Sequence, residues 1–321
     1  MIRSFIFSSL LSTAAFAQVG GPFLGYVPDG NQIRHLYGLP AAGAIGSVIQ
    51  SPGFSHIALP PQQSFAVVTA ADSGQVMIAS EASTGFALTA IPGASPNPDI
   101  LAISPAGTSA AFWIPSTGHL QTVSGLPNSP SLRDVDASFL HTAPSAIAVS
   151  DDGQWTVALF TAGLYAFGPA AQVIPLQTDP GIVALAFFHN NHNLALANAA
   201  RATSIADVGG ADQPSLLYDY SQQSLSPVAV ATSFDNQHAV VADASGKLVN
   251  INAAASTANF VDCACSPLGL FGLGDSVFRL NGTGRTGLDR TGPTPDLKVF
   301  DASAGAVWIV PPALSGKAAR Q

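Results

Sequence analysis

Short apolar segments separated by turn-forming residues follow one another along most of the chain. In residues 146–159, two apolar segments flank an Asp-Asp-Gly turn. Such a turn between short, partly β-branched flanks is typical of a β-hairpin. Similar strand–turn–strand segments recur about 42 residues apart, with equivalent positions at Leu59, Ser104, Ser150, Phe188, Ser233 and Phe271.

A second Gly-marked turn follows the first hairpin in four of these units, at residues 72–74, 116–118, 162–163 and 244–246. Each unit is therefore predicted to hold four short strands, which is typical of a β-propeller blade. A β-sandwich is the alternative fold, because its strands also recur at intervals of about 8 to 12 residues. We predict an all-β protein with a single β-propeller domain of four-stranded blades.

The number of blades depends on the two ends of the repeat region. Six units are visible, while the length of the chain leaves room for about seven. A further hairpin is predicted at residues 23–37, and it resembles the last hairpin, at residues 297–310. It either begins a seventh blade or packs beside the last unit and closes the ring, since an open ring would expose strand edges. We favour seven blades over six.

The strands nearest the axis should carry small side chains, because a blade narrows toward the centre of the ring. Larger aromatic side chains should fill the wider space between blades; we assign this role to Trp113, Trp155 and Phe187. The residues assigned to innermost strands are Ala102, Ile103, Ala148, Val149, Ala186, Val230 and Ala231.

Two of the repeats resemble a known bacterial repeat. The segments Ala-Val-Ser-Asp-Asp-Gly at 148–153 and Ile-Ser-Pro-Ala-Gly at 103–107 are similar to blades of the YVTN-type, lactonase-like β-propeller family of exported bacterial proteins. The copies at 59–62 and 271–274 depart from the pattern. The resemblance implies a propeller whose ligands bind on one face, formed by the loops that lead into the innermost strands and the loops between second and third strands.

On that face we predict a ligand-binding site. Because only 9% of the chain is charged, a gathering of ionisable side chains on one rim would be non-random. One of them lies in a long loop at residues 282–296. The partner is expected to be a small molecule, a glycan or a protein. The predicted site residues are His56, Asp99, His141, Asp179, Arg201, Asp243 and Arg285.

The first residues have the three parts of a signal peptide. Arg3 supplies the positive charge, residues 5–16 are an apolar segment, and Ala-Phe-Ala precedes a predicted cut before Gln18. The alternative is a buried N-terminal strand or helix. We therefore expect a secreted or periplasmic protein with a signal peptide at 1–17, a propeller domain at 18–312 and a disordered tail at 313–321. No apolar stretch is long enough to suggest a membrane span.

Composition narrows the classes of partner. The formal charge is -8, with 11 Lys and Arg against 19 Asp and Glu, so no basic surface for nucleic acid is expected. Glu81 is the one glutamate of the chain, which leaves Asp and His as the candidates for acid–base chemistry. We expect a monomer.

Few residues suggest catalysis or metal binding. His189 and His192 form the one histidine cluster, but in a hairpin turn their side chains need not converge on a metal, and we favour a polar turn. Asp134 and Asp136 face the same way in a predicted strand, where they either share a cation or keep an edge strand solvated. No nucleophile-elbow motif is present. We predict no cofactor and no metal.

Two functional hypotheses follow. The first is a non-catalytic binding or scaffold propeller, and the second is a lactonase-like hydrolase or another enzyme at the mouth of the channel. Fold resemblance alone supports the second. The lining of the central channel distinguishes them, because catalysis needs converging His, Asp or Arg side chains, whereas a lining of small and apolar residues favours binding.

Cys263 and Cys265 are the two cysteines of the chain. Export to an oxidising compartment favours a disulfide between them. In an extended strand, residues two apart have Cα atoms near the upper limit of about 6.8 Å for a bridge, so the bond requires a local bend. The alternative is a pair of free thiols that pack as small hydrophobic groups beside Leu268.

Overall fold

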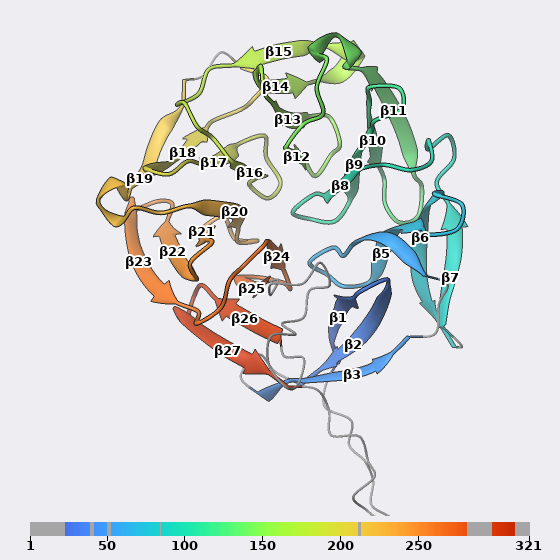
Figure 1. The fold of residues 1–321 in the computed structure, drawn as a ribbon, viewed down its shortest axis with the longest axis horizontal. Coiled ribbons are helices and arrows are strands. Elements are labelled where there is room, and N and C mark those ends of the chain that lie inside the picture. The colour runs from blue at the N-terminus through green and yellow to red at the C-terminus, as the bar shows by residue number, and fades with distance from the viewer. Residues whose placement is uncertain are drawn as a thin grey trace, which may run out of the picture.

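The strands form seven antiparallel sheets that stand like blades around a central axis (Figure 1). The computed structural model describes residues 23–38, 42–49, 53–83, 85–210, 213–280 and 297–311. Six blades have four strands each, and one has three. The all-β propeller fold and the preference for seven blades are confirmed. The predicted signal peptide and tail lie outside the described residues.

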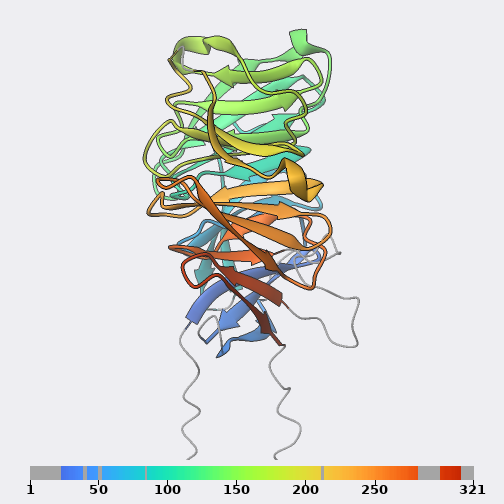
Figure 2. The same ribbon diagram turned by 90° about the vertical axis from the view of Figure 1, so that its left-hand side faces the viewer.

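The strand order within each blade follows the chain outward from the axis, as Figure 1 shows; Figure 2 shows the same ring from the side. The first two four-stranded blades contain β4 (Phe54–Ala58), β5 (Phe65–Ala70), β6 (Val76–Ala82), β7 (Gly85–Ala90), β8 (Ile100–Ile103), β9 (Ser109–Ile114), β10 (His119–Ser124) and β11 (Ser131–Asp136). The next two contain β12 (Ala146–Val149), β13 (Thr156–Phe160), β14 (Gly163–Phe167), β15 (Val173–Leu176), β16 (Ala184–Phe187), β17 (Leu194–Ala197), β18 (Arg201–Ile205) and β19 (Ser215–Asp219). The last two contain β20 (Pro227–Thr232), β21 (His238–Asp243), β22 (Lys247–Asn252), β23 (Thr257–Asp262), β24 (Leu270–Gly272), β25 (Val277–Leu280), β26 (Leu297–Asp301) and β27 (Ala306–Val310).

The hydrophobic core is divided among the seven interfaces between neighbouring blades. Strand β5 shows why: all of its residues are buried, because both of its faces are covered. Phe65 and Val67 face the blade that begins with β8, whereas Ala66 and Val68 face the N-terminal blade. The two-residue period of a strand thus divides one apolar run between two interfaces.

The assignments of small and large side chains are confirmed. The seven residues expected on innermost strands lie in β8, β12, β16 and β20. Trp155 is 6% exposed and packs between the β12–β15 and β16–β19 blades. Its indole lies so close to Gly168 and Gly209 that a Cβ at either position would come within 2.6 Å of the ring. The position of the Trp155 indole therefore requires glycine at both 168 and 209, one on each of the two blades.

The N-terminal blade consists of β1 (Phe23–Asp29), β2 (Gln32–Tyr37) and β3 (Ala44–Val48). In the described part of the chain, no strand pairs with β1 on the side of the axis. The Gln63 side chain, from the turn after β4, occupies part of this position: its Oε1 accepts a hydrogen bond of 2.9 Å from the Tyr26 N–H, and its Nε2 donates one of 2.9 Å to the Pro60 carbonyl. This arrangement explains why six repeat units are visible although the ring has seven blades.

Contacts on both sides attach this three-stranded blade to its neighbours. The Ile45 N–H donates a 2.9 Å hydrogen bond to the carbonyl of Pro311, just after β27. On the other side, the Tyr26 hydroxyl donates to Glu81 Oε2, and His35 Nε2 lies 3.1 Å from Glu81 Oε1. The one glutamate of the chain thus joins the first and second blades in chain order.

Candidate functional site

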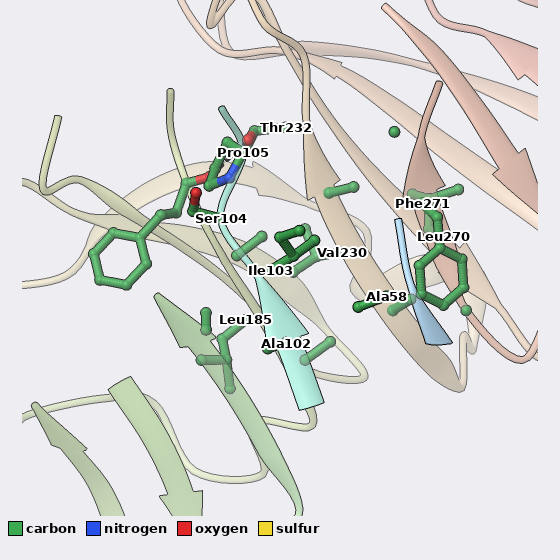
Figure 3. Close-up of a pocket in the computed structure, with 18 of the residues that line it drawn as sticks. Ala58, Ala102, Ile103, Ser104, Pro105, Leu185, Val230, Thr232, Leu270 and Phe271 are labelled. Atoms are coloured by element: carbon green, nitrogen blue, oxygen red, sulfur yellow. Dashed lines mark hydrogen bonds between the residues drawn. The ribbon is translucent and has the colours of Figure 1, made fainter. Parts of the chain in front are cut away.

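The innermost strands of the six four-stranded blades enclose a central channel (Figure 3). Its cavity has a volume of about 370 Å³. None of the described residues of the three-stranded N-terminal blade lines it. The labelled residues of the lining are Ala58, Ala102, Ile103, Ser104, Pro105, Leu185, Val230, Thr232, Leu270 and Phe271. The channel is therefore lined mainly by small and apolar side chains.

Its polar groups come mostly from the backbone. Each of the six innermost strands is the edge strand of its sheet, so one row of N–H and C=O groups faces away from the sheet and toward the axis. Among the described residues that line the channel, Asp275 is the one charged side chain, and none is His, Lys or Arg. A general acid and a general base are thus not brought together in this lining.

Exposed apolar side chains continue the lining at both ends of the channel. We call the end with the turns from first to second strands the turn rim, and the opposite end the loop rim. Val183, just before β16 at the loop rim, is 47% exposed. At the turn rim, Phe234 is 40% exposed, and its ring lies against that of His189 at an interplanar angle of 31°, with 3.6 Å between the ring centroids.

Contacts between neighbouring turns form a closed circuit at the turn rim. The Asp151 carboxylate accepts hydrogen bonds from the Ala106 N–H, at 2.5 Å, and the Asn190 N–H, at 2.7 Å, and so connects three blades. Asn236 exchanges two hydrogen bonds with the backbone of His189. Phe234 N–H donates a hydrogen bond to the Asp275 carbonyl. Pro61 lies close to Gly272 and Pro60 lies close to Gly107, which completes the circuit. Six turns, one for each innermost strand, thus fix the width of the channel.

The aspartates and histidines of these turns have structural contacts. Asp152 accepts hydrogen bonds from Ser150 Oγ and the Gln154 N–H within its own turn. His192 lies 2.9 Å from Asp152 Oδ2, whereas His189 lies 4.0 Å from Asp151 Oδ2. The two histidines therefore approach different carboxylates, in agreement with the polar-turn interpretation. The described residues contain no group of three or more His, Cys, Asp or Glu that could hold a metal ion.

The pair Asp134 and Asp136 lies on the outermost strand β11. His119 Nδ1 is 3.0 Å from Asp134 Oδ1, while Asp136 Oδ1 accepts a hydrogen bond from the Ser138 N–H. The hydrogen bonds from Ser138 lower the pKa of Asp136. The two carboxylates thus have separate partners on a solvated outer strand.

The strand topology puts five predicted site residues at or next to the loop rim, while His56 lies in the middle of β4. In an antiparallel blade, the starts of the first and third strands lie at the same rim as the end of the second strand. His56 is in β4, Asp99, His141 and Asp179 precede first strands, Arg201 begins the third strand β18, and Asp243 ends the second strand β21. Arg285 lies outside the described residues.

Two of these residues are brought together, and one has a structural role. Asp179 Oδ2 lies 3.9 Å from Arg201 Nε, in a polar groove. Asp243 is buried and accepts hydrogen bonds from the N–H groups of Ser226 and Ser245. Burial would raise the pKa of Asp243, but the hydrogen bonds from Ser245 and Ser226 hold it below its ordinary value. Asp243 thus stabilises the loops of its own blade.

Cys263 and Cys265 form a disulfide in the loop between β23 and β24. Their Cα atoms are 5.1 Å apart, less than in an extended strand. The intervening Ala264 has φ of 47°, in the left-handed region, and its N–H donates to Asp262 Oδ1 at 2.8 Å. This residue provides the bend that a bridge between such close cysteines requires.

The sequence suggests that the channel lining separates binding from catalysis, but it places the predicted site residues on the loops. The lining residues of the channel were assigned to innermost strands for their small size, without a functional role. The signal that could have identified them is the low polarity of all six innermost segments, because a channel lined by apolar side chains is a common form of ligand site. In the ranges that the structure describes, no helix is long and apolar enough to cross a membrane.

Comparisons with known proteins show the fold and no family. No family profile matches this sequence, and no curated protein is significantly similar to it. Among solved structures, the β-propeller domain of Cps50 (Swd1) from Myceliophteria thermophila is similar over 82% of this chain and 88% of that one, with 13% identity and a TM-score of 0.59. A functionally unknown protein from Desulfotomaculum acetoxidans covers 91% and 100%, with 16% identity and a TM-score of 0.57. Apo AztD from Citrobacter koseri covers 91% and 83%, with 11% identity and a TM-score of 0.57.

Proposed function

We propose that this protein is an exported, non-catalytic binding propeller that holds a small apolar molecule in its central channel. The observation that carries the proposal is the lining of the 370 Å³ cavity, which is apolar except for one carboxylate, the hydroxyls of Ser104, Ser145 and Thr232, and the backbone edges of the strands. Sites for small molecules usually have volumes of about 300 to 1,000 Å³ and mostly apolar walls. The exposed Val183 and Phe234 at the two ends extend the apolar surface that such a ligand would meet.

The expected ligand has a compact apolar body and few polar groups. Removing apolar surface from water would drive its binding. Asp275 and the backbone edges of the innermost strands could accept a hydrogen bond from one hydroxyl or N–H group of the ligand. A strongly charged or many-hydroxyl ligand would lose more hydration than this lining could replace.

The lining favours binding over hydrolysis. A hydrolase at the channel mouth would need a general base and an electrophilic or acidic partner near the same substrate atom. Asp275 has no basic side chain beside it in the lining that the structure describes. The lactonase-like alternative rests on the resemblance of the repeats alone, and fold does not determine function.

Export is the part of the proposal that rests on the sequence. The charged, apolar and small-residue parts of residues 1–17 support a cleaved signal peptide. N-terminal sequencing of the protein from its native host should give a mature chain that begins at Gln18. A chain that retains Met1 would contradict export by this route.

Channel-filling variants test the binding function. N-phenyl-1-naphthylamine, an uncharged apolar probe with one N–H group, should fluoresce strongly and saturably with the native protein. Ala102→Leu fills the channel and should weaken probe binding at least about tenfold, because an added side chain takes up the space of the ligand. Ala87→Leu, on the exposed outer strand β7, is the matched control and should bind like the native protein. Failure to bind the probe, or equal binding by the Ala102 variant, would contradict the proposal.

A further inference from the structure

A polar groove lies between the outer parts of two adjacent blades, away from the channel. The loop between β15 and β16 supplies Gln177, Thr178 and Asp179, and the next blade supplies Arg201, Thr203 and Leu216. The cavity has a volume of about 330 Å³ and lies within the usual range of about 300 to 1,000 Å³ for small-molecule sites. In contrast to the channel, its walls are mainly polar side chains.

The charged pair in this groove keeps hydrogen-bonding capacity for a third group. Asp179 Oδ2 and Arg201 Nε are 3.9 Å apart, which is beyond hydrogen-bond distance, and the two side chains are 35% and 44% exposed. A guanidinium has five N–H donors and a carboxylate has about four acceptor positions. The pair therefore offers donors and acceptors a few ångströms apart. Asp219, the cross-strand partner of Arg201, adds a second carboxylate beside the guanidinium.

Thr203 lies beneath this pair with an unsatisfied hydroxyl. It is two residues after Arg201 in β18, so both side chains face the same side of the blade, and Leu216 is its cross-strand partner. Thr203 is 4% exposed, and its Oγ1 has no hydrogen-bond partner among the described residues. Buried hydroxyls are usually hydrogen-bonded, so this one lacks a partner. A group in the groove could supply that partner once the Thr203 side chain turns toward it. Rotation about χ1 moves the hydroxyl without moving the strand.

We propose that this groove binds a neutral saccharide. Adjacent hydroxyls of a sugar each donate and accept, so they match a guanidinium and a carboxylate placed side by side. The amide of Gln177 and the hydroxyls of Thr178 and Thr203 provide further partners of the same double character. Leu216, which is 53% exposed, offers an apolar surface to the C–H groups of a sugar ring.

A zwitterionic amino acid is the competing ligand, and it fits less well. Its ammonium and carboxylate groups would use Asp179 and Arg201, but the amide and the two hydroxyls would be left without ligand partners. Asp219 beside Arg201 also opposes a ligand carboxylate at the guanidinium. A groove rich in groups that both donate and accept is better matched by a ligand with many hydroxyls. The site is separate from the channel and does not depend on the function proposed for it.

Calorimetric titration of the full chain tests the proposal. The probes are the methyl glycosides of glucose, galactose, mannose and N-acetylglucosamine, with glycine and serine as zwitterionic competitors. At least one glycoside should bind saturably. Asp179→Asn and Arg201→Gln should each weaken its binding at least about tenfold, because each removes charge-assisted hydrogen bonds. Glycine and serine should not displace the sugar.

A pair of threonine variants separates a ligand contact from a structural effect. Thr203→Val removes the unsatisfied hydroxyl with little change of shape, so it should leave the melting temperature unchanged or raised while it weakens sugar binding. Thr69→Val is the matched control, because Thr69 Oγ1 is also buried and has no hydrogen-bond partner among the described residues. Thr69 lies in β5 and does not line the groove. This variant should keep full sugar binding.

Several results would overturn the inference. Lack of binding by all four glycosides would exclude the saccharide, and displacement by glycine or serine would favour the zwitterion. Unchanged binding in Asp179→Asn would place the sugar elsewhere. The channel variant Ala102→Leu should bind the sugar like the native protein, so failure of this site and failure of the channel proposal give different results.

Discussion

Asp151 provides the sharpest test of how the ring is held together. Its carboxylate accepts hydrogen bonds from the backbone N–H groups of Ala106 and Asn190, which belong to the two neighbouring blades. The side chain is 8% exposed, so water screens these bonds little. The change Asp151→Ala removes both bonds and leaves two N–H groups at the turn rim without their acceptor.

The expected loss of stability follows from the two bonds. A hydrogen bond to a charged group contributes about 1.5 to 3 kcal/mol, so the pair accounts for about 3 to 6 kcal/mol. We expect the lower half of this range, because water can enter the space that the carboxylate leaves and satisfy part of the N–H groups. Asp151→Asn keeps one acceptor oxygen and should therefore lose about half as much.

Urea unfolding followed by tryptophan fluorescence measures this loss. The matched control is Asp235→Ala, because Asp235 accepts from Ser233 Oγ and the Gln237 N–H within a single turn and does not connect blades. Because Asp235 is exposed, water screens its two bonds and can replace the lost acceptor, so the control should lose less, about 1 to 2 kcal/mol. Equal losses in Asp151→Ala and Asp235→Ala would refute the reasoning that the bonds between blades have an added stabilising effect.

Three further predictions concern other parts of the ring. Trp155→Ala should lower the free energy of unfolding by about 3 to 5 kcal/mol, because it opens a cavity between two blades; a loss well below this in urea titrations would mean that the site collapses. The pKa of Glu81 is lowered below its ordinary value of 4.5, mainly by the hydrogen bond from the Tyr26 hydroxyl. Ionised Glu81 therefore stabilises the fold above pH 4.5, and this contribution is lost as the pH falls below that value. Glu81→Gln should therefore be less stable than the native protein at neutral pH, with a difference that shrinks in acid, and a pH-independent difference would be inconsistent with this. Mass spectrometry of the unreduced protein after alkylation should detect no free thiol at Cys263 or Cys265, whereas two alkylated cysteines would rule out the disulfide.

The sequence by itself determined the strands and the turns between them. The apolar segments and Asp-Asp-Gly turn of residues 146–159 correspond to β12, β13 and the turn that joins them. Such features depend on neighbours a few residues apart: the two-residue period of a half-buried or buried strand and the backbone conformations that turn residues allow. Their recurrence about every 42 residues was enough to predict a propeller, because one blade cannot bury both of its faces alone.

Only the tertiary structure decided which side chains meet. The loop rim could be predicted from topology, yet among its predicted residues that the structure describes only Asp179 and Arg201 form an ion pair, while Asp243 is engaged in its own loops. Likewise, no local sequence pattern shows that the Asp151 carboxylate joins three blades. Nor does one show that the Gln63 side chain accepts the hydrogen bond from the Tyr26 N–H that an inner strand would otherwise accept. These contacts join residues far apart in the chain, and the radius and closure of the ring bring them together. Periodicity along the chain determines each blade, but the distances between blades, and therefore the channel and the groove, depend on how seven of them pack around one axis.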